Sequence, residues 1–269
     1  MLRKINKTHI YYTLFTLLLL IFFLYARFPS KVVETYIVNA AAERYPQAFV
    51  SLSSVSVALP PGLILENMLF GFRDDLEANI RLDQCRVRPR LLGYLTGRSS
   101  FAVRAIAYGG SLQGVVNYAD FTPKKIPSDA EVRFQGINLD KIAYLKKKLG
   151  RQISGALGGS YRYKGDSQLD FTIQKGSYQL LEQMFGMDKL DFNTLEGQLS
   201  LKGGVLKVTR LNLKGANFNC SLKGDITLNS DFKKSVLNMS GSVEIAALNN
   251  KKISILLTGT LDNVQAKYI

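Results

Sequence analysis

The segment from Leu195 to Leu228 reads LEGQLSLKGGVLKVTRLNLKGANFNCSLKGDITL, and apolar residues recur in it at every second position over short stretches. Leu199 and Leu201 lead into Gly203-Gly204, a pair that is typical of a tight turn between strands. The phase slips at Leu211, as a β-bulge would produce. Because successive side chains of a strand point to opposite faces, the pattern predicts antiparallel strands with one covered and one solvent-facing side.

The same period of two extends in both directions from this segment. Towards the C-terminus it is carried by Leu237, Met239, Val243, Ile245, Ile253, Ile255 and Leu257. Towards the N-terminus it begins near Phe49, and Gly109-Gly110 marks a further hairpin. We therefore predict a mainly β fold for residues 47–269, a curved antiparallel β-meander forming an open sheet or trough.

Two interior segments of this region are expected to depart from strand structure. The run KIAYLKKKLG at 141–150 follows Asn138-Leu-Asp140 and ends on a glycine, which predicts a short helix. Residues 176–190 are expected to form a second short helix or an irregular connection. The prediction for the domain is thus a meander with one or two short helices.

The N-terminal region contains an uncharged run from Ile10 to Ala26, IYYTLFTLLLLIFFLYA. With its flanking residues it approaches the length of helix that crosses a bilayer core of about 30 Å. Arg3, Lys4 and Lys7 precede the run, which by the positive-inside tendency places the N-terminus in the cytoplasm. We therefore predict an uncleaved transmembrane anchor and cytoplasmic tip over residues 1–28.

Residues 29–46 are expected to form an amphipathic helix that connects the anchor to the β domain. Its apolar residues fall at helical spacing, and the expected apolar face comprises Val32, Val33, Tyr36, Ile37, Ala40 and Ala41. Packing of this face against the sheet is the favoured interpretation, and a position on the membrane surface is the alternative.

Composition argues against an enzyme. The only histidine is His9, beside the predicted anchor, so the β domain lacks the residue used in Ser-His-Asp, Cys-His and HExxH sites. No catalytic residue, metal ligand or cofactor-binding residue is therefore assigned. The net charge of +14 favours anionic partners, and with an anchor in place lipid headgroups suit it better than nucleic acid.

Basic residues gather in two places. One cluster comprises Lys146, Lys147, Lys148 and Arg151 at the end of the predicted interior helix; it is interpreted as a solvated helix end, with contact to anionic lipid or a partner protein as the alternative. The other group comprises Arg81, Arg86, Arg88, Arg90, Arg98 and Arg104.

The two cysteines, Cys85 and Cys220, are too few for a disulfide scaffold. An oxidising compartment would permit one bridge between them. Two separately buried thiols are the favoured reading.

Three further stretches suggest a family. The anchor runs into YARFPSKVVETYIVNAAAERYP (25–46), LPPGLILENMLF follows at 59–70, and RVRPRLLGYLTGRSSFAVRAIAYGGSLQGVV spans 86–116. Together these resemble the type II secretion system protein N (GspN) family. The run beginning at Leu195 is similar to that family and also to AsmA-like envelope proteins.

The first resemblance implies a non-catalytic protein of the bacterial inner membrane, single-pass, with its bulk in the periplasm. Such a protein would be accessory to type II secretion across the outer membrane and would contact other secretion subunits. The AsmA-like similarity implies the alternative, a lipid-binding or lipid-transfer protein of envelope maintenance that holds phospholipid against an apolar surface. Neither resemblance transfers functional residues to this chain.

Overall fold

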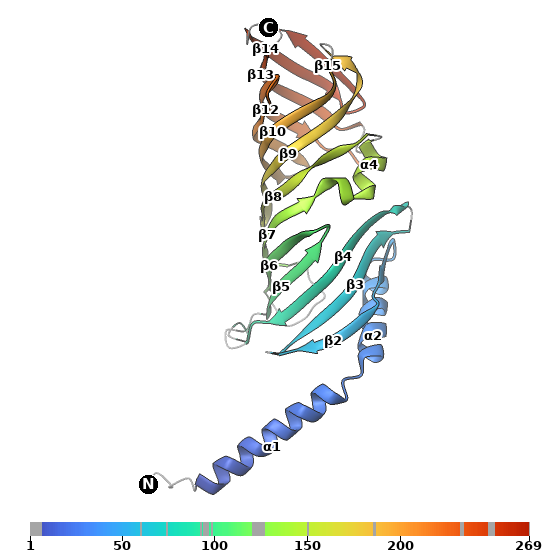
Figure 1. Cartoon of the computed structure of the whole chain (residues 1–269), viewed down its shortest axis with the longest axis vertical. Coiled ribbons are helices and arrows are strands. Elements are labelled where there is room, and N and C mark those ends of the chain that lie inside the picture. Colours follow the sequence, from blue (N-terminus) through green and yellow to red (C-terminus); the bar gives the residue numbers. More distant parts are fainter. Residues whose placement is uncertain are drawn as a thin grey trace.

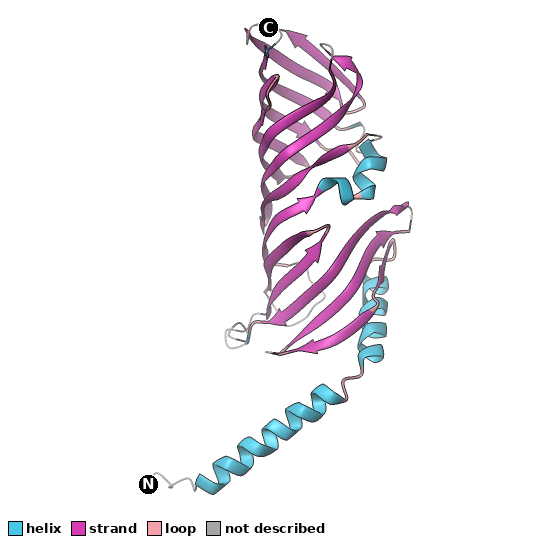
Figure 2. Cartoon of the chain, viewed as in Figure 1, coloured by secondary structure: helices cyan, strands magenta, loops and turns pink. Residues whose placement is uncertain are grey.

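A computed structural model of the chain describes residues 7–268 except 60, 74, 92, 94–96, 98, 120–126, 150, 185–186, 232–233 and 247–250. Its main feature is one antiparallel sheet of fifteen strands, and Figure 2 shows how strands dominate the chain. The order of the sheet begins with β1, passes through β3 to β14 in sequence and ends with β15, while β2 also pairs with β3. The predicted mainly β, open antiparallel meander is therefore confirmed.

The strands follow one another with short connections. They are β1 (Ala48–Ser51), β2 (Ser54–Ala58), β3 (Gly62–Phe72), β4 (Asp75–Pro89), β5 (Ser99–Ala107), β6 (Gly110–Tyr118), β7 (Asp129–Asn138), β8 (Ile153–Lys164), β9 (Asp166–Met184), β10 (Met187–Lys202), β11 (Val205–Lys214), β12 (Phe218–Thr227), β13 (Val236–Ile245), β14 (Lys251–Thr260) and β15 (Asn263–Tyr268).

Turn chemistry explains two of the hairpins. Gly203 and Gly204 join β10 to β11 with φ values of 56° and 80°, the left-handed conformation that a two-residue hairpin turn requires and that glycine adopts without strain. Between β5 and β6 the turn residues are Tyr108 and Gly109, one position earlier than the Gly109-Gly110 pair expected from the sequence. Gly110 instead pairs with Ala107 as the first residue of β6.

The phase slip expected near Leu211 is present. The pairing of β11 with β12 shifts register between Val208 and Leu211, so both side chains remain on one face although they are three residues apart.

Residues 176–190 were expected to contain a short helix or an irregular connection, and this prediction was wrong. β9 and β10 run through the described part of this region and stay paired, for example at Leu190 and Tyr178. The local sequence has the adjacent residues Leu180 and Leu181, which break the alternation. Pairing with the neighbouring strand determines the conformation where the local pattern is ambiguous.

Helix α1 covers Lys7–Ala26 and precedes the sheet, as Figure 1 shows. The large apolar side chains described along it are exposed, from Ile10 to Tyr25. Over the described residues, however, no helix reaches the combination of length and apolarity needed to cross a bilayer.

Helix α2 (Ser30–Arg44) packs on the first strands of the sheet. Its contacting side chains are Val33, Ile37, Val38 and Ala41, which lie against a cluster that includes Val55 and Leu65. Val32 and Tyr36 were expected on the packed face, but they are 67% and 71% exposed. The face in contact is therefore rotated from the expected one, and Val38 takes part in it.

The interior helix lies near the middle of the sheet. A short 3₁₀ turn η1 (Leu139–Lys141) is followed by α4 (Ala143–Leu149), close to the predicted helix at 141–150. Leu139 of η1 is buried in a cluster with Ile173 and Phe192, and Leu145 of α4 packs beside it. Figure 1 shows the sheet curved around the side on which α2 and α4 lie, so this side is its concave side.

Candidate functional site: an apolar sheet face

Cross-strand register joins side chains of successive strands into rows that cross the whole sheet. Partners in an antiparallel ladder lie on the same face, so a row can be followed from strand to strand. The first row passes from β2 to β15 through Val55, Leu65, Cys85, Ala105, Leu112, Phe134, Gly159, Phe171, Gly197, Leu211, Leu222, Gly241, Ile255 and Tyr268.

A second row runs beside the first on the same face. It consists of Val57, Leu63, Val87, Val103, Gly114, Val132, Tyr161, Leu169, Leu199, Val208, Gly224, Met239, Leu257 and Ala266. Neither row contains a charged residue. We call the surface formed by these two rows the apolar face.

A third row continues this surface over β7 to β14. Its members are Ile137, Leu157, Ile173, Leu195, Leu213, Cys220, Val243 and Ile253. Because α2 and η1–α4 pack against residues of these rows, the apolar face lies on the concave side of the sheet.

Coverage of the apolar face decreases along the sheet. At the end under α2, Val55 is 1% exposed and Leu65 is 7% exposed. From Leu112 onwards most members of the first row are only partly buried, and Tyr268 in β15 is 73% exposed. Partly exposed apolar side chains over so many strands form an extended apolar surface whose contact with water is unfavourable.

Phenylalanines lie over glycines in the middle of the concave side of the sheet. Phe171 pairs with Gly197 across the ladder, and a Cβ added to Gly197 would overlap the Phe171 ring. Phe192 lies over Gly176 in the same way, and the Phe134 ring lies 2.9 Å from the position of a Cβ on Gly159. Each ring thus covers the backbone of the neighbouring strand, as in aromatic rescue of a glycine, rather than standing upright on the sheet.

Substitution of Gly197 by alanine is expected to lower the free energy of unfolding by about 1–3 kcal/mol, the usual cost of overpacking, because the Phe171 ring must leave its place. Urea unfolding of the full chain in detergent measures the change. The G197A/F171L double variant is the matched control and should recover part of the loss, since a leucine can move aside. An unchanged midpoint in G197A would show that the ring does not rest on the glycine.

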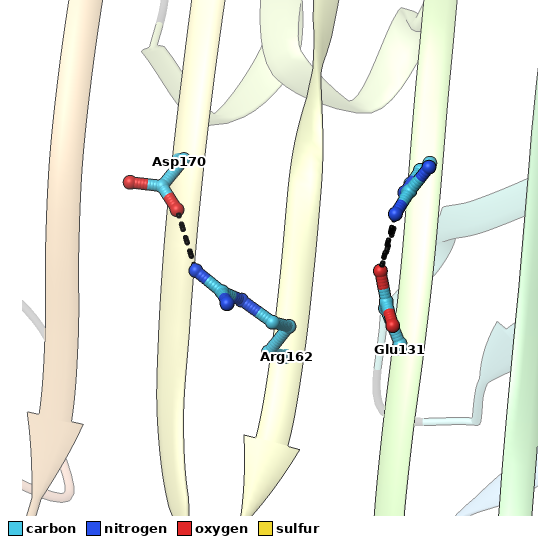
Figure 3. A network of polar contacts seen from close by, with 4 residues as sticks. Glu131, Arg162 and Asp170 are labelled. Atoms are coloured by element: carbon cyan, nitrogen blue, oxygen red, sulfur yellow. Dashed lines mark hydrogen bonds and ion pairs between the residues drawn. The ribbon is translucent and has the colours of Figure 1, made fainter.

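The opposite face of the sheet is polar. One of its rows reads Ser56, Ile64, Arg86, Arg104, Gln113, Arg133, Ser160, Asp170, Gln198 and Arg210. Figure 3 shows two of its ion pairs: Arg162 lies 3.5 Å from Asp170, and Arg133 lies 2.9 Å from Glu131. All four side chains are at least 38% exposed, so these pairs contribute little to stability.

Both cysteines belong to the rows of the concave side. Cys85 is buried in β4, and Cys220 is half-buried in β12. Both are free, and strands β5 to β11 separate them in the sheet, so the candidate Cys85–Cys220 disulfide does not form in this structure. Burial disfavours the charged thiolate and therefore raises the pKa of both thiols, that of Cys220 to about 11.

The raised pKa predicts slow alkylation of Cys220 at neutral pH. Relative to an ordinary thiol of pKa 9.0, a value of about 11 leaves roughly a hundredfold less thiolate. In the Cys85→Ser variant, the rate with iodoacetamide should rise about tenfold per pH unit up to about pH 11, because only the thiolate reacts. The urea-unfolded variant is the control and should level off near pH 9; the same plateau in the folded protein would contradict the prediction.

The basic cluster around α4 is only partly described. Lys146 is exposed, and the side chains of Lys147 and Lys148 lie outside the described residues. Arg151 donates a hydrogen bond of 2.9 Å from Nη1 to the carbonyl of Leu180, which gives it a partner within the sheet. Among the described residues, no group of three or more His, Cys, Asp or Glu side chains is arranged to hold a metal ion.

Comparison of the chain with protein-family models, with curated proteins and with solved structures finds no match.

Proposed function

We propose that the apolar face binds the hydrocarbon chains of lipids, in a non-catalytic protein that α1 anchors in a membrane. The observation that carries this proposal is the pair of uncharged rows that cross the sheet from β2 to β15 while most of their side chains stay partly exposed. Cofactor and nucleic acid play no part in it.

The physical reason is the gain from removing this surface from water. Each buried methylene group contributes about 0.8 kcal/mol, so an acyl chain lying along the rows gains several kcal/mol without any directional contact. Acyl chains are flexible, and they can follow a curved surface of Leu, Val and Ile side chains. The polar face meanwhile remains in solvent, as its exposed ion pairs favour.

The anchor is supported by the sequence and by the exposure of α1. No charged residue occurs between Ile10 and Ala26, and Phe15 and Phe22 are 64% and 66% exposed. Side chains of this kind are stable in hydrocarbon and costly in water. The N-terminus is proposed to lie in the cytoplasm and the sheet in the periplasm of a bacterial inner membrane.

A role in type II secretion remains a second proposal, based on the sequence resemblance. The structural observation in its favour is β15, which is the last strand in the order of the sheet and is exposed throughout its length. An edge strand can pair with a strand of another protein. Cross-linking in membranes, followed by capture of the chain, should recover secretion subunits; capture of none would remove this proposal.

Lipid binding is tested by extracting the chain in detergent, washing it extensively and identifying bound molecules by mass spectrometry. Phospholipid in stoichiometric amounts is expected. Protein free of lipid, and unable to take up a fluorescent phospholipid from vesicles, would overturn the proposed function.

A further inference from the structure

Two leucines are exposed at the end of the sheet that lies nearest to α1. Leu59 is in the turn between β2 and β3, and Leu91 is in the loop between β4 and β5. They are 64% and 65% exposed. Figure 1 shows that β2 and β4, which lead to these leucines, both end at the lower end of the sheet, on the side of α1.

Described residues next to both leucines are hydrogen-bonded. The β2–β3 hairpin is closed by the pairing of Ala58 with Gly62. In the other loop, the Arg90 amide donates to the Ser100 carbonyl at 2.8 Å, and the Gly93 amide donates to the Arg90 carbonyl at 3.0 Å. Leu91 therefore lies within a hydrogen-bonded turn that projects it from the sheet.

Exposed basic residues accompany these leucines. Arg90 precedes Leu91, and Arg27 and Lys31 stand where α1 passes into α2. Single exposed leucines are common on protein surfaces, but here two occur on neighbouring turns at one end, and the exposed Arg90 directly precedes one of them. Apolar residues that enter the acyl region, with Lys or Arg at the headgroups, are the chemistry by which proteins contact an anionic bilayer.

We propose that the turns carrying Leu59 and Leu91 form a membrane-contact rim that touches the anionic phospholipid surface from which α1 emerges. The proposal rests on the anchoring of the chain by α1 and adds the place where the sheet meets the bilayer. Leu59 follows Val57 of the second row by two positions, so the rim also brings the end of the apolar face to the lipid.

The chain contains no tryptophan, so a single introduced one reports its own surroundings. The full chain carrying Leu59→Trp or Leu91→Trp is reconstituted into vesicles of phosphatidylcholine and phosphatidylglycerol with brominated acyl chains, which quench tryptophan on contact. Two controls carry the probe farther along the sheet: Val205→Trp beside the β10–β11 turn, 37% exposed, and Val264→Trp in the last strand β15, 47% exposed. Val264 pairs with Gly259 on the concave side, so it reports lipid held by the sheet rather than by the bilayer.

The expected result is quenched, blue-shifted emission from L59W and L91W and unquenched emission from V205W. Emission from L59W and L91W that is quenched no more than that of V205W overturns the rim, whatever the quenching of V264W. Flotation of the unsubstituted chain with the vesicles distinguishes a failure of the α1 anchor from a failure of the rim. A chain that fails to float has lost the anchor and with it the proposed function, whereas a floating chain with unquenched turns has lost the rim alone.

Discussion

Replacing Leu169 by aspartate is expected to weaken lipid binding by about a hundredfold. Leu169 belongs to the second row of the apolar face, between Tyr161 and Leu199. In the lipid-free protein the site is partly open, so the carboxylate stays hydrated and the fold is retained. When an acyl chain covers it, the carboxylate must leave water at a cost of roughly 2.5–3.5 kcal/mol, the value for aspartate in hydrocarbon, and about 1.4 kcal/mol corresponds to tenfold in affinity. Titration with a fluorescent phospholipid measures the loss.

The matched control is Gln168→Asp, which adds the same charge one residue away. Gln168 is exposed and lies on the polar face, beside Arg162 and Ser200. The Gln168→Asp variant should bind lipid as tightly as the unsubstituted chain. The pair Leu257→Asp and Thr258→Asp repeats the comparison in β14. If both members of a pair lost binding equally, or neither did, the apolar face would not be the binding surface.

Removal of residues 1–28 is expected to shift the chain almost completely from the membrane fraction to the soluble fraction. The deleted part contains α1 and its uncharged run, which supplies most of the proposed hydrophobic attachment. Alkaline extraction of membranes followed by centrifugation measures the distribution.

A less disruptive version of this experiment replaces Leu18 and Leu19 by lysine, with valine at both positions as the control. The two lysines should release the chain, because each costs roughly 2.5–3.5 kcal/mol at the centre of a span. The two valines should not. Retention of the lysine variant in the membrane would contradict the role proposed for α1.

The sequence was sufficient to predict the meander but not the surface that the meander builds. Alternation of apolar residues and the glycine pair at Gly203-Gly204 predicted strand, turn and the bulge before Leu211, all of which depend on neighbours along the chain. The alignment of Phe171 over Gly197 depends on the register between two strands, which alternation alone leaves undetermined. The rows, and with them the candidate site, therefore became visible only in the structure.

The α2 face shows a second limit of the same kind. Val32 and Tyr36 fit the helical period as well as Val38 does, and the period cannot tell which side meets the sheet. The position of Val55 and Leu65 beneath the helix determines which side of α2 packs on the sheet. In the same way, the hydrogen bond from Arg151 to the Leu180 carbonyl joins residues whose proximity no local pattern predicted.

From β3 onwards every strand pairs with the one synthesised just before it, which has a consequence for how the protein reaches its fold. Large β proteins fold slowly when segments distant in the sequence must pair, because long loops have to close before any stabilising contact forms. Here each new strand pairs only with the strand that is already at the edge of the sheet. The sheet can therefore form strand by strand from its N-terminal end while later residues are still being synthesised. We therefore expect a folding rate nearer that of proteins dominated by short-range contacts than the size of the sheet suggests.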